Sequence, residues 1–274
     1  MRVSADMPDD VIVLHDALQQ LRDYSRSPLT ANRSPLILNL KNCGTALRFL
    51  QVHLERCYPG ELITLTGDPR LMERNGAPTT QTTSALIMHG VDVPVSPDES
   101  PYITMTRRIV QAYPYIQLER DWSSAAFWYE YIAIHGGELH LEGLTDDSLQ
   151  GDRIVADIYA EYFGVTTTFA PEGVNIKHQT SNIKHNSVSL NFERIPDLYP
   201  AIALTCERLG IILHATGTER LAYKESNRLE AVAEHEVRHD HRMAMALLVA
   251  GFPVDDTDCI AKSYPTFLEQ FMQL

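Results

Sequence analysis

A five-residue match to the HExxH motif is the first feature that could carry chemistry. His235, Glu236 and His239 fit the pattern of helical zinc proteases, in which two histidines four residues apart hold the metal and the glutamate acts as base. His241 follows closely. Such a helix needs an apolar face beneath its ligands, whereas residues 234–242 are almost wholly polar. Short motifs match often by chance, so a zinc hydrolase is a minor alternative, and solvated or ion-paired histidines are the favoured interpretation.

The scarce basic residues indicate a second chemistry, the binding of anions. Lys224 and Arg228 are four residues apart, which places them on one face of a helix expected to begin near Glu225. Arg242 immediately precedes an apolar helix expected over 243–250, and an arginine there can hold phosphate or carboxylate with two hydrogen bonds. A surface ion-pair network of Lys224, Glu225 and Arg228 explains the same pattern equally well. The five lysines of the chain are Lys41, Lys177, Lys184, Lys224 and Lys262.

Three expected helices open with small polar residues, at 43–45, 79–82 and 121–124. Hydroxyls and free backbone N–H groups at a helix N-terminus can bind an anion. Ordinary N-capping explains each of the three taken singly. Together they suggest repeated units, with some helix ends directed toward a phosphorylated ligand.

Segments with helical and strand periodicity alternate along the chain, which predicts an α/β or α+β fold. We expect helices over 9–21, 43–54, 154–163 and 198–209, and strands over 36–40, 61–66, 138–141 and 187–192. The first helix is expected to bury a stripe of Val11, Leu14, Ala17, Leu18 and Leu21. Two lobes are expected, residues 1–119 and 120–274, which meet near residues 118–121.

Composition limits the possible partners. The 274 residues include 36 acidic and 23 basic side chains, and the resulting net charge of −13 opposes bulk binding to nucleic acid or to membrane phosphates. Any phosphate must therefore bind in a local basic pocket. No run of 18 apolar residues occurs, so no membrane span is expected. Four dispersed cysteines, Cys43, Cys57, Cys206 and Cys259, predict buried free thiols in a reducing, cytoplasmic compartment.

Nine segments carry motifs that occur together in one enzyme family. They are NCGTALRFL (42–50), LTGDPRLMER (65–74), TTQTTSALIM (79–88), SPYI (100–103), RDWSSAAFWY (120–129), IPDL (195–198), YKESNRL (223–229), DHRMAMA (240–246) and AKSYP (261–265). In this order they resemble the 5-enolpyruvylshikimate-3-phosphate (EPSP) synthases. On this resemblance, the HExxH match is a chance overlap of a helix end with the DHR segment.

The resemblance implies a fold and an activity. The fold is a two-domain arrangement of repeated βαβαββ units, with helices inside and sheets outside, which closes over its substrates. The reaction transfers the enolpyruvyl group of phosphoenolpyruvate to the 5-hydroxyl of shikimate 3-phosphate and releases phosphate, in the shikimate pathway to chorismate and the aromatic amino acids. The resemblance implies these two small-molecule partners and no metal or organic cofactor. We expect a monomer.

The resemblance also assigns residues to the reaction. Phosphoenolpyruvate would bind Gly44, Arg74, Gln81, Arg228, Arg242 and Lys262, and shikimate 3-phosphate would bind Thr79, Thr80, Gln81, Tyr102, Asp197 and Lys224. Cations fit this task because they offset the repulsion between two polyanionic substrates. Asp197 would be the base and Glu225 the proton donor, with Lys262 as the alternative donor and His241 as a shuttle. Lys224 and Arg228 beside Glu225 would favour its ionised form, and Arg48 would support the Gly44 loop.

Several features depart from the family pattern. The family's N-terminal Lys-Ser segment has no counterpart, since no lysine precedes Lys41, and gaps are expected after Arg74, before Ser100 and between residues 236 and 240. Glu99 stands where a phosphate-binding serine is usual, and its charge would oppose a phosphate. Two interpretations stay open: segments of a full-length enzyme are missing from the sequence, or the chain is a shortened, non-catalytic relative that binds phosphometabolites. The sister enzyme with a UDP-sugar acceptor is disfavoured, because its loop cysteine has no match.

Overall fold

The structure is a computed structural model that describes residues 7–26, 34–73, 79–115, 118–179 and 185–274. The chain separates into two compact units, Met1–Ile116 (the first unit) and Gln117–Leu274 (the second unit). The lobe boundary expected between residues 119 and 120 stays a prediction. Arg74 lies outside the described residues.

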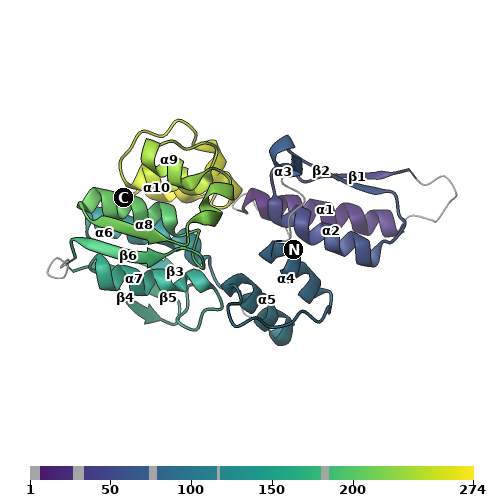
Figure 1. The fold of residues 1–274 in the computed structure, drawn as a ribbon, viewed down its shortest axis with the longest axis horizontal. Coiled ribbons are helices and arrows are strands. Elements are labelled where there is room, and N and C mark those ends of the chain that lie inside the picture. The colour runs from purple at the N-terminus through teal and green to yellow at the C-terminus, as the bar shows by residue number, and fades with distance from the viewer. Residues whose placement is uncertain (1–6, 27–33, 74–78, 116–117, 180–184) are drawn as a thin grey trace. The chain divides into compact units, whose positions relative to one another are not determined.

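The first unit is built on a short parallel strand pair (Figure 1). Strands β1 (Leu36–Asn39) and β2 (Ile63–Thr66) pair in register from Leu36 opposite Ile63, and α2 (Gly44–Cys57) connects them. This is a βαβ unit, the connection that a parallel pair requires. Leu38 and Leu40 bury their side chains completely against the helices, so the strand expected over 36–40 is confirmed.

Helix α1 (Asp9–Arg26) packs against α2 and β1. Its buried residues are Val13, Ala17 and Leu21, whereas Val11 and Leu18 are exposed. The expected helix is therefore confirmed, but its buried stripe was placed wrongly at two positions. Residues 13, 17 and 21 repeat every four positions and stay on one narrow face, because the small core of this unit covers only part of the helix.

Three more helices complete the described part of the first unit: α3 (Pro69–Glu73), α4 (Thr80–Met88) and α5 (Pro101–Ala112). Helix α4 packs against both α2 and α5. The side chains of Cys43 and Thr79 cap α2 and α4 by accepting hydrogen bonds from the backbone N–H groups of Ala46 and Thr82. N-capping by small polar residues was expected at both helices and is confirmed.

The second unit contains two sheets and a larger set of helices. Strands β3 (Glu138–Glu142), β5 (Gly173–His178) and β4 (Val165–Ala170) form an antiparallel sheet in that order, while β6 (Ser187–Asn191) and β7 (Ile212–Thr216) form a parallel pair. The helical elements are α6 (Trp122–His135), η1 (Gly151–Ile154), α7 (Val155–Tyr162), α8 (Tyr199–Leu209), η2 (Glu219–Tyr223), α9 (Arg228–Glu234), α10 (His241–Val249), η3 (Asp258–Lys262) and α11 (Phe267–Phe271).

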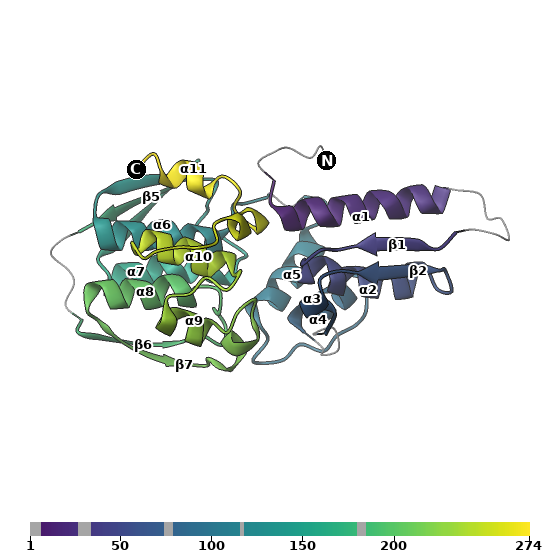
Figure 2. The same cartoon turned by 90° about the horizontal axis from the view of Figure 1, so that it is seen from above.

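Helices α6, α8 and α10 pack together in the interior of the second unit (Figure 2). Helix α6 contacts all three strands of the antiparallel sheet, and α8 contacts β7. These helices are apolar almost all round, which is the pattern of a helix surrounded by protein. The expected α/β class is thereby confirmed, and the second unit has its helices inside and its sheets outside. Among the described residues, no helix combines the length and the apolar character needed to cross a membrane.

Candidate functional site

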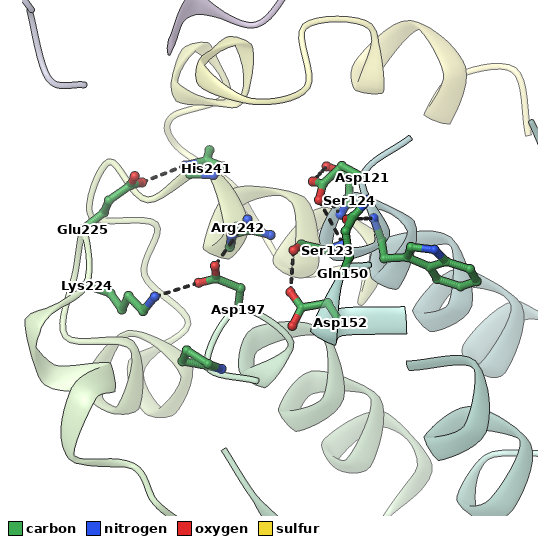
Figure 3. A network of polar contacts seen from close by, with 12 residues as sticks. Asp121, Ser123, Ser124, Gln150, Asp152, Asp197, Lys224, Glu225, His241 and Arg242 are labelled. Carbon is green, nitrogen blue, oxygen red and sulfur yellow. Dashed lines mark hydrogen bonds and ion pairs between the residues drawn. The ribbon is translucent and has the colours of Figure 1, made fainter. Parts of the chain in front are cut away.

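Asp197 is the centre of an ion-pair network in the second unit (Figure 3). It lies in the loop that leads into α8. Its Oδ1 atom is 3.1 Å from Lys224 Nζ and 2.7 Å from Arg228 Nη1. Its Oδ2 atom is 3.6 Å from Arg242 Nη2, at the first turn of α10. Two segments of the chain, residues 223–229 and 240–246, thus bring three cations to one carboxylate.

Arg228 joins this network to a second, fully buried carboxylate. Its Nε donates to Asp240 Oδ2 at 2.8 Å, and its Nη1 also donates to the carbonyl of Pro196 at 3.2 Å. The other oxygen of Asp240 accepts from the backbone N–H of Arg242 at 3.0 Å and caps α10. Only 2% of the Arg228 side chain is exposed. Arg228 is therefore held by acceptors of the protein itself.

Two expectations for this segment were wrong. Helix α9 begins at Arg228 and Lys224 precedes it in extended conformation, so the two cations do not share a helix face. They come together because each binds Asp197. The network is also not a surface one, since Arg228 is buried.

Glu225 forms a second cluster beside the first (Figure 3). Its Oε2 lies 2.7 Å from His241 Nδ1 and its Oε1 lies 3.4 Å from Lys262 Nζ. Burial alone would raise the pKa of Glu225, but the hydrogen bond to His241 and the positive charges of His241 and Lys262 outweigh burial and lower it. The ionised form was expected, yet the foremost cations are His241 and Lys262 rather than Lys224 and Arg228.

The cations around Asp197 set its protonation state. Burial would raise the pKa of this carboxyl, but the charges of Arg242, Lys224 and Arg228 hold it well below its ordinary value. Asp197 is therefore an ionised, weakly basic carboxylate as long as these cations face it. An anion bound at Lys224 or Arg242 would offset part of that positive charge and make Asp197 a stronger base.

Sequence patterns did not single out Asp152, which belongs to the same region of the second unit. Its side chain is buried, and its Oδ2 accepts a hydrogen bond from Ser123 Oγ at the first turn of α6. Its Oδ1 is buried without a partner. Burial, together with the charge of Asp197, raises the pKa of Asp152 to about 7. The polar residues at 121–124, where α6 begins, were the only sequence signal near Asp152. They did not predict that Asp152, which lies on η1, would contact Ser123.

The first unit holds the residues expected around Gly44. Arg48 Nη1 donates to Gln81 Oε1 at 2.8 Å, and Gln81 Nε2 donates to Thr45 Oγ1 at 2.8 Å. A Cβ atom on Gly44 would lie only 2.6 Å from Arg48 Nη1. The glycine thus leaves room for the guanidinium group against the first turn of α2. Arg48 fastens this turn to α4, in line with the supporting role expected for it.

The remaining expected site residues of the first unit lie on α4 and α5. Thr80 opens α4, after the capping residue Thr79, and Tyr102 lies in the first turn of α5, where its carbonyl accepts from Thr106 Oγ1 at 2.9 Å. Glu99 pairs with Arg107 at 2.9 Å, so its charge is balanced within the first unit. The roles assigned to these residues and to those of the second unit stay predictions.

The HExxH match does not form a zinc-protease helix. Helix α9 ends at Glu234, and His235, Arg238 and His239 have positive φ values of 53°, 52° and 58°. His235 stacks on Phe252 and contacts Glu207, whereas His239 contacts Asp256. The spacing of four residues therefore does not place the two histidines on one helix face. The minor alternative of a zinc hydrolase at this motif is wrong.

Glu225, Asp240 and His241 could hold a metal ion by distance alone, since their ligand atoms lie within 4.8 Å of one another. Lys262 and Arg228 already occupy the two carboxylates as cationic partners. A metal ion there would have to displace these cations, so the cluster fits an anion-binding region better than a metal centre.

Comparison with known families matches residues 90–239 and 233–271 to the family described as EPSP synthase (3-phosphoshikimate 1-carboxyvinyltransferase). A 3-phosphoshikimate 1-carboxyvinyltransferase of Syntrophobacter fumaroxidans is 31% identical over 191 residues, which are 57% of this chain and 44% of the relative. The enzyme of the same name from Bacteroides fragilis is 28% identical over 187 residues, 55% of this chain and 45% of the relative. The chain spans less than half the length of these two relatives.

A third relative is matched more completely. The 3-phosphoshikimate 1-carboxyvinyltransferase of Methanosphaerula palustris is 25% identical over 333 residues, which cover 84% of this chain and 78% of the relative. This alignment is longer than the 274-residue chain, so it must open gaps in the chain. Internal gaps relative to the family were expected from the motif spacing.

Proposed function

The chain belongs to the EPSP synthase family, and from this premise we propose that it carries residues for the transfer of the enolpyruvyl group of phosphoenolpyruvate to the 5-hydroxyl of shikimate 3-phosphate. One observation carries the proposal: Asp197 is surrounded by Lys224, Arg228 and Arg242 at 3.1, 2.7 and 3.6 Å. A base and several anion-binding groups are thus within reach of one another. This is what a reaction between two anionic substrates and a hydroxyl group requires.

In this proposal, the two partly buried cations, Lys224 and Arg242, bind substrate, and the fully buried Arg228 positions the carboxylate between them. Lys224 and Arg242 offer donors at the rim of the network, whereas Arg228 is committed to Asp240, Asp197 and Pro196. Arg228 therefore holds Asp197 in place rather than binding phosphoenolpyruvate directly. This assignment differs from the role that the family resemblance gave it.

The proposed chemistry needs two proton transfers. Asp197 takes the proton of the 5-hydroxyl while the hydroxyl oxygen forms its bond to the carbon of phosphoenolpyruvate that carries the phosphate. The methylene carbon takes a proton from the group at Glu225, His241 and Lys262. Because the pKa of Glu225 is lowered, Lys262 or His241 is the better final donor in this cluster. In the elimination, the same cluster takes back a proton from the methyl group, the double bond re-forms and the bond to phosphate breaks, so that phosphate leaves. The carboxylates stabilise the cationic transition state.

A coupled phosphate-release assay on the full chain tests the proposal. Phosphate should appear only when both substrates are present, and Asp197→Ala should mainly lower kcat, while Arg242→Ala should raise the KM for phosphoenolpyruvate and lower kcat. Equal rates for Asp197→Ala and the parent would remove Asp197 from the mechanism. A fold check by circular dichroism on each variant separates loss of chemistry from loss of structure.

A second function, binding of phosphometabolites without catalysis, is favoured by one observation. Glu99, a carboxylate, stands where a phosphate-binding serine is usual in the family, and a negative charge there would oppose a substrate phosphate. Titration calorimetry with shikimate 3-phosphate separates the two functions. Binding that is weakened by Lys224→Ala, without phosphate release when phosphoenolpyruvate is added, would support this second function. With either function we propose a reducing, cytoplasmic location, because the four cysteines are free thiols dispersed along the chain.

A further inference from the structure

Three side chains with metal-binding atoms meet in the first unit, and none of them has a role in the proposed reaction. His53 and Cys57 are four residues apart in the last turns of α2, and His89 is the residue that follows α4. The ligand atoms of His53, Cys57 and His89 all lie within 4.8 Å of one another. On a regular helix, positions four apart face the same side, so His53 and Cys57 present their ligand atoms together.

The two imidazoles are already at a spacing that one metal ion can bridge. His53 Nδ1 and His89 Nε2 lie 3.3 Å apart. Two nitrogens bound to zinc at about 2.0–2.1 Å with tetrahedral angles lie about 3.3–3.4 Å apart. Only the Cys57 side chain then has to approach, and it is free to do so because Cys57 is exposed and is a free thiol.

The electrostatic setting favours the protonation state that binds a metal. Burial, and the neighbouring charge of His89, lower the pKa of His53. Neutral imidazole is the form that ligates metal ions. A thiol loses its proton on coordination, which makes binding tighter as pH rises. The expectation that the cysteines are buried was wrong at Cys57, and its exposure is what makes the thiol accessible to an ion.

We propose that His53, Cys57 and His89 form a binding site for a divalent transition-metal ion of the zinc type, with water as the fourth ligand. Imidazole nitrogen and thiolate sulfur are ligands that such ions select over Mg²⁺ and Ca²⁺. The proposal does not rest on the enzymatic function proposed above, because none of these three residues has a role in that reaction.

A metal ion at this position would link helices α2 and α4. Helices α2 and α4 are joined at their first turns by the hydrogen bond from Gln81 to Thr45, and at their ends by the contact between His53 and His89. The two helices therefore run in the same direction. A bound ion would tie their C-terminal ends together and restrain the helices that carry Gly44 and Gln81 at the opposite ends.

The test is titration of the reduced full chain with Zn²⁺ alone, in competition with a chromophoric chelator. We expect one equivalent to bind. Cys57→Ser and His89→Ala should each weaken binding by about 100-fold or more, because loss of an outer-shell partner alone costs about 10–100-fold. His239→Ala, which alters an exposed histidine of the HExxH match, is the matched control and should bind Zn²⁺ like the parent. Binding that survives both Cys57→Ser and His89→Ala, or is lost in His239→Ala, would overturn the proposal.

Two further measurements distinguish loss of a metal ligand from misfolding of the variant. Co²⁺ in place of Zn²⁺ should give a sulfur-to-metal charge-transfer band that Cys57→Ser abolishes, and this variant changes an exposed side chain. Hydrogen exchange should show Zn²⁺-dependent protection in α2 and α4 of the parent and none in Cys57→Ser. A parent that binds no Zn²⁺, or a Co²⁺ spectrum without the sulfur band, would refute the site.

Discussion

The Arg228–Asp240 pair of the second unit and the Gln81 contacts of the first unit lie at different depths. In the second unit, Arg228 and Asp240 form an ion pair in which the side chains are 2% and 0% exposed. In the first unit, the contacts of Gln81 with Thr45 and Arg48 are partly open to solvent. A buried charged group is stabilised only by its protein partners, whereas an exposed group that loses a partner can form a hydrogen bond to water instead. Depth of burial, more than the number of contacts, should therefore decide what each substitution does.

The size of the two cores accounts for this difference. The core of the second unit includes α6, α8 and α10 with both sheets around them, while the described core of the first unit is a small cluster between α1, α2 and β1. The larger core can enclose ionised side chains because it surrounds them with partners from several segments. The smaller core leaves its helix ends near solvent, where a metal ion could reach His53 and Cys57.

The largest expected effect is on the buried pair. Arg228→Ala leaves Asp240 without its main cationic partner, and removal of one member of a buried ion pair typically lowers the free energy of unfolding by about 3–5 kcal/mol. Denaturation followed by tryptophan fluorescence measures this, because both tryptophans, Trp122 and Trp128, lie on α6 in the second unit.

Arg238 is the matched control for this substitution. It pairs with Glu230, Glu234 and Glu236, but 30% of its side chain is exposed. Arg238→Ala should leave the unfolding midpoint nearly unchanged, since exposed ion pairs contribute little. Equal losses from Arg228→Ala and Arg238→Ala would show that depth of burial does not separate the two networks.

The second prediction concerns pH and Asp152. The pKa of its carboxyl is raised to about 7, first by burial and then by the charge of Asp197, while Arg242 opposes the shift. Between about pH 4 and pH 7 the folded chain keeps a proton that the unfolded chain releases. The free energy of unfolding should therefore fall as pH rises through this window, by up to about 1.4 kcal/mol per pH unit.

Asp152→Asn should remove this contribution, because an amide does not titrate. The slope of stability against pH should become less negative in the variant, as measured by urea denaturation at several pH values. Asp240 does not obscure the result: its pKa is lowered to about 2, as Arg228 outweighs its burial, so its stabilisation is lost only below about pH 4. Identical slopes in the variant and the parent would show that Asp152 is ionised throughout.

Much of the fold was predictable because local patterns dictate it. Periodicity placed β1, α2, β3 and α8 within a few residues of their observed bounds, and the N-caps at Cys43, Thr79 and Asp121 are local signals. The buried face of α1 was not predictable at the level of single residues. Val13 is buried and Val11 is exposed because of the residues that pack against α1, and these residues are distant in sequence.

The residues of the polar clusters were harder to predict than the helices and strands, because their partners are distant in sequence. HExxH suggested a metal site, yet the helix ends one residue before the motif begins. His53, Cys57 and His89 carried no recognised motif, although His53 and Cys57 show helical spacing, because the third ligand comes from another helix. The cations of the DHR and KESNR segments were predicted to lie near each other through the family resemblance. Asp152 was missed since its partners, Ser123 and Asp197, are far from it in sequence.

A third, smaller effect is expected at Glu130 on α6. Its carboxylate is 0% exposed and neither oxygen has a hydrogen-bond partner. Burial raises the pKa of Glu130 well above its ordinary value. Glu130→Leu removes this unpartnered group and should raise the free energy of unfolding by about 1–3 kcal/mol.

The pH dependence of this gain provides the check. Because the folded-state pKa is raised, the parent loses stability as pH increases above about 4.5, so the advantage of Glu130→Leu should be larger at pH 8 than at pH 5. Glu130→Gln is the control, since it abolishes titration and keeps a polar group in the core. A destabilised Glu130→Leu would mean that this carboxyl has a compensating partner, and the contrast between the units would weaken.

The smallest effect is expected in the first unit, at Gln81. Gln81→Ala removes the hydrogen bonds to Thr45 and from Arg48, which join the first turns of α2 and α4. Their partners remain partly accessible to water, so the loss in the free energy of unfolding should be about 0.5–1.5 kcal/mol, the net value of an ordinary hydrogen bond.

Hydrogen exchange in α2 and α4 is the suitable measurement, because the tryptophans report on the second unit. Zn²⁺ should restore part of the lost protection if the opposite ends of these helices share a metal ion. A loss as large as that of Arg228→Ala would mean that the first unit depends on Gln81 as heavily as the second depends on its buried charges.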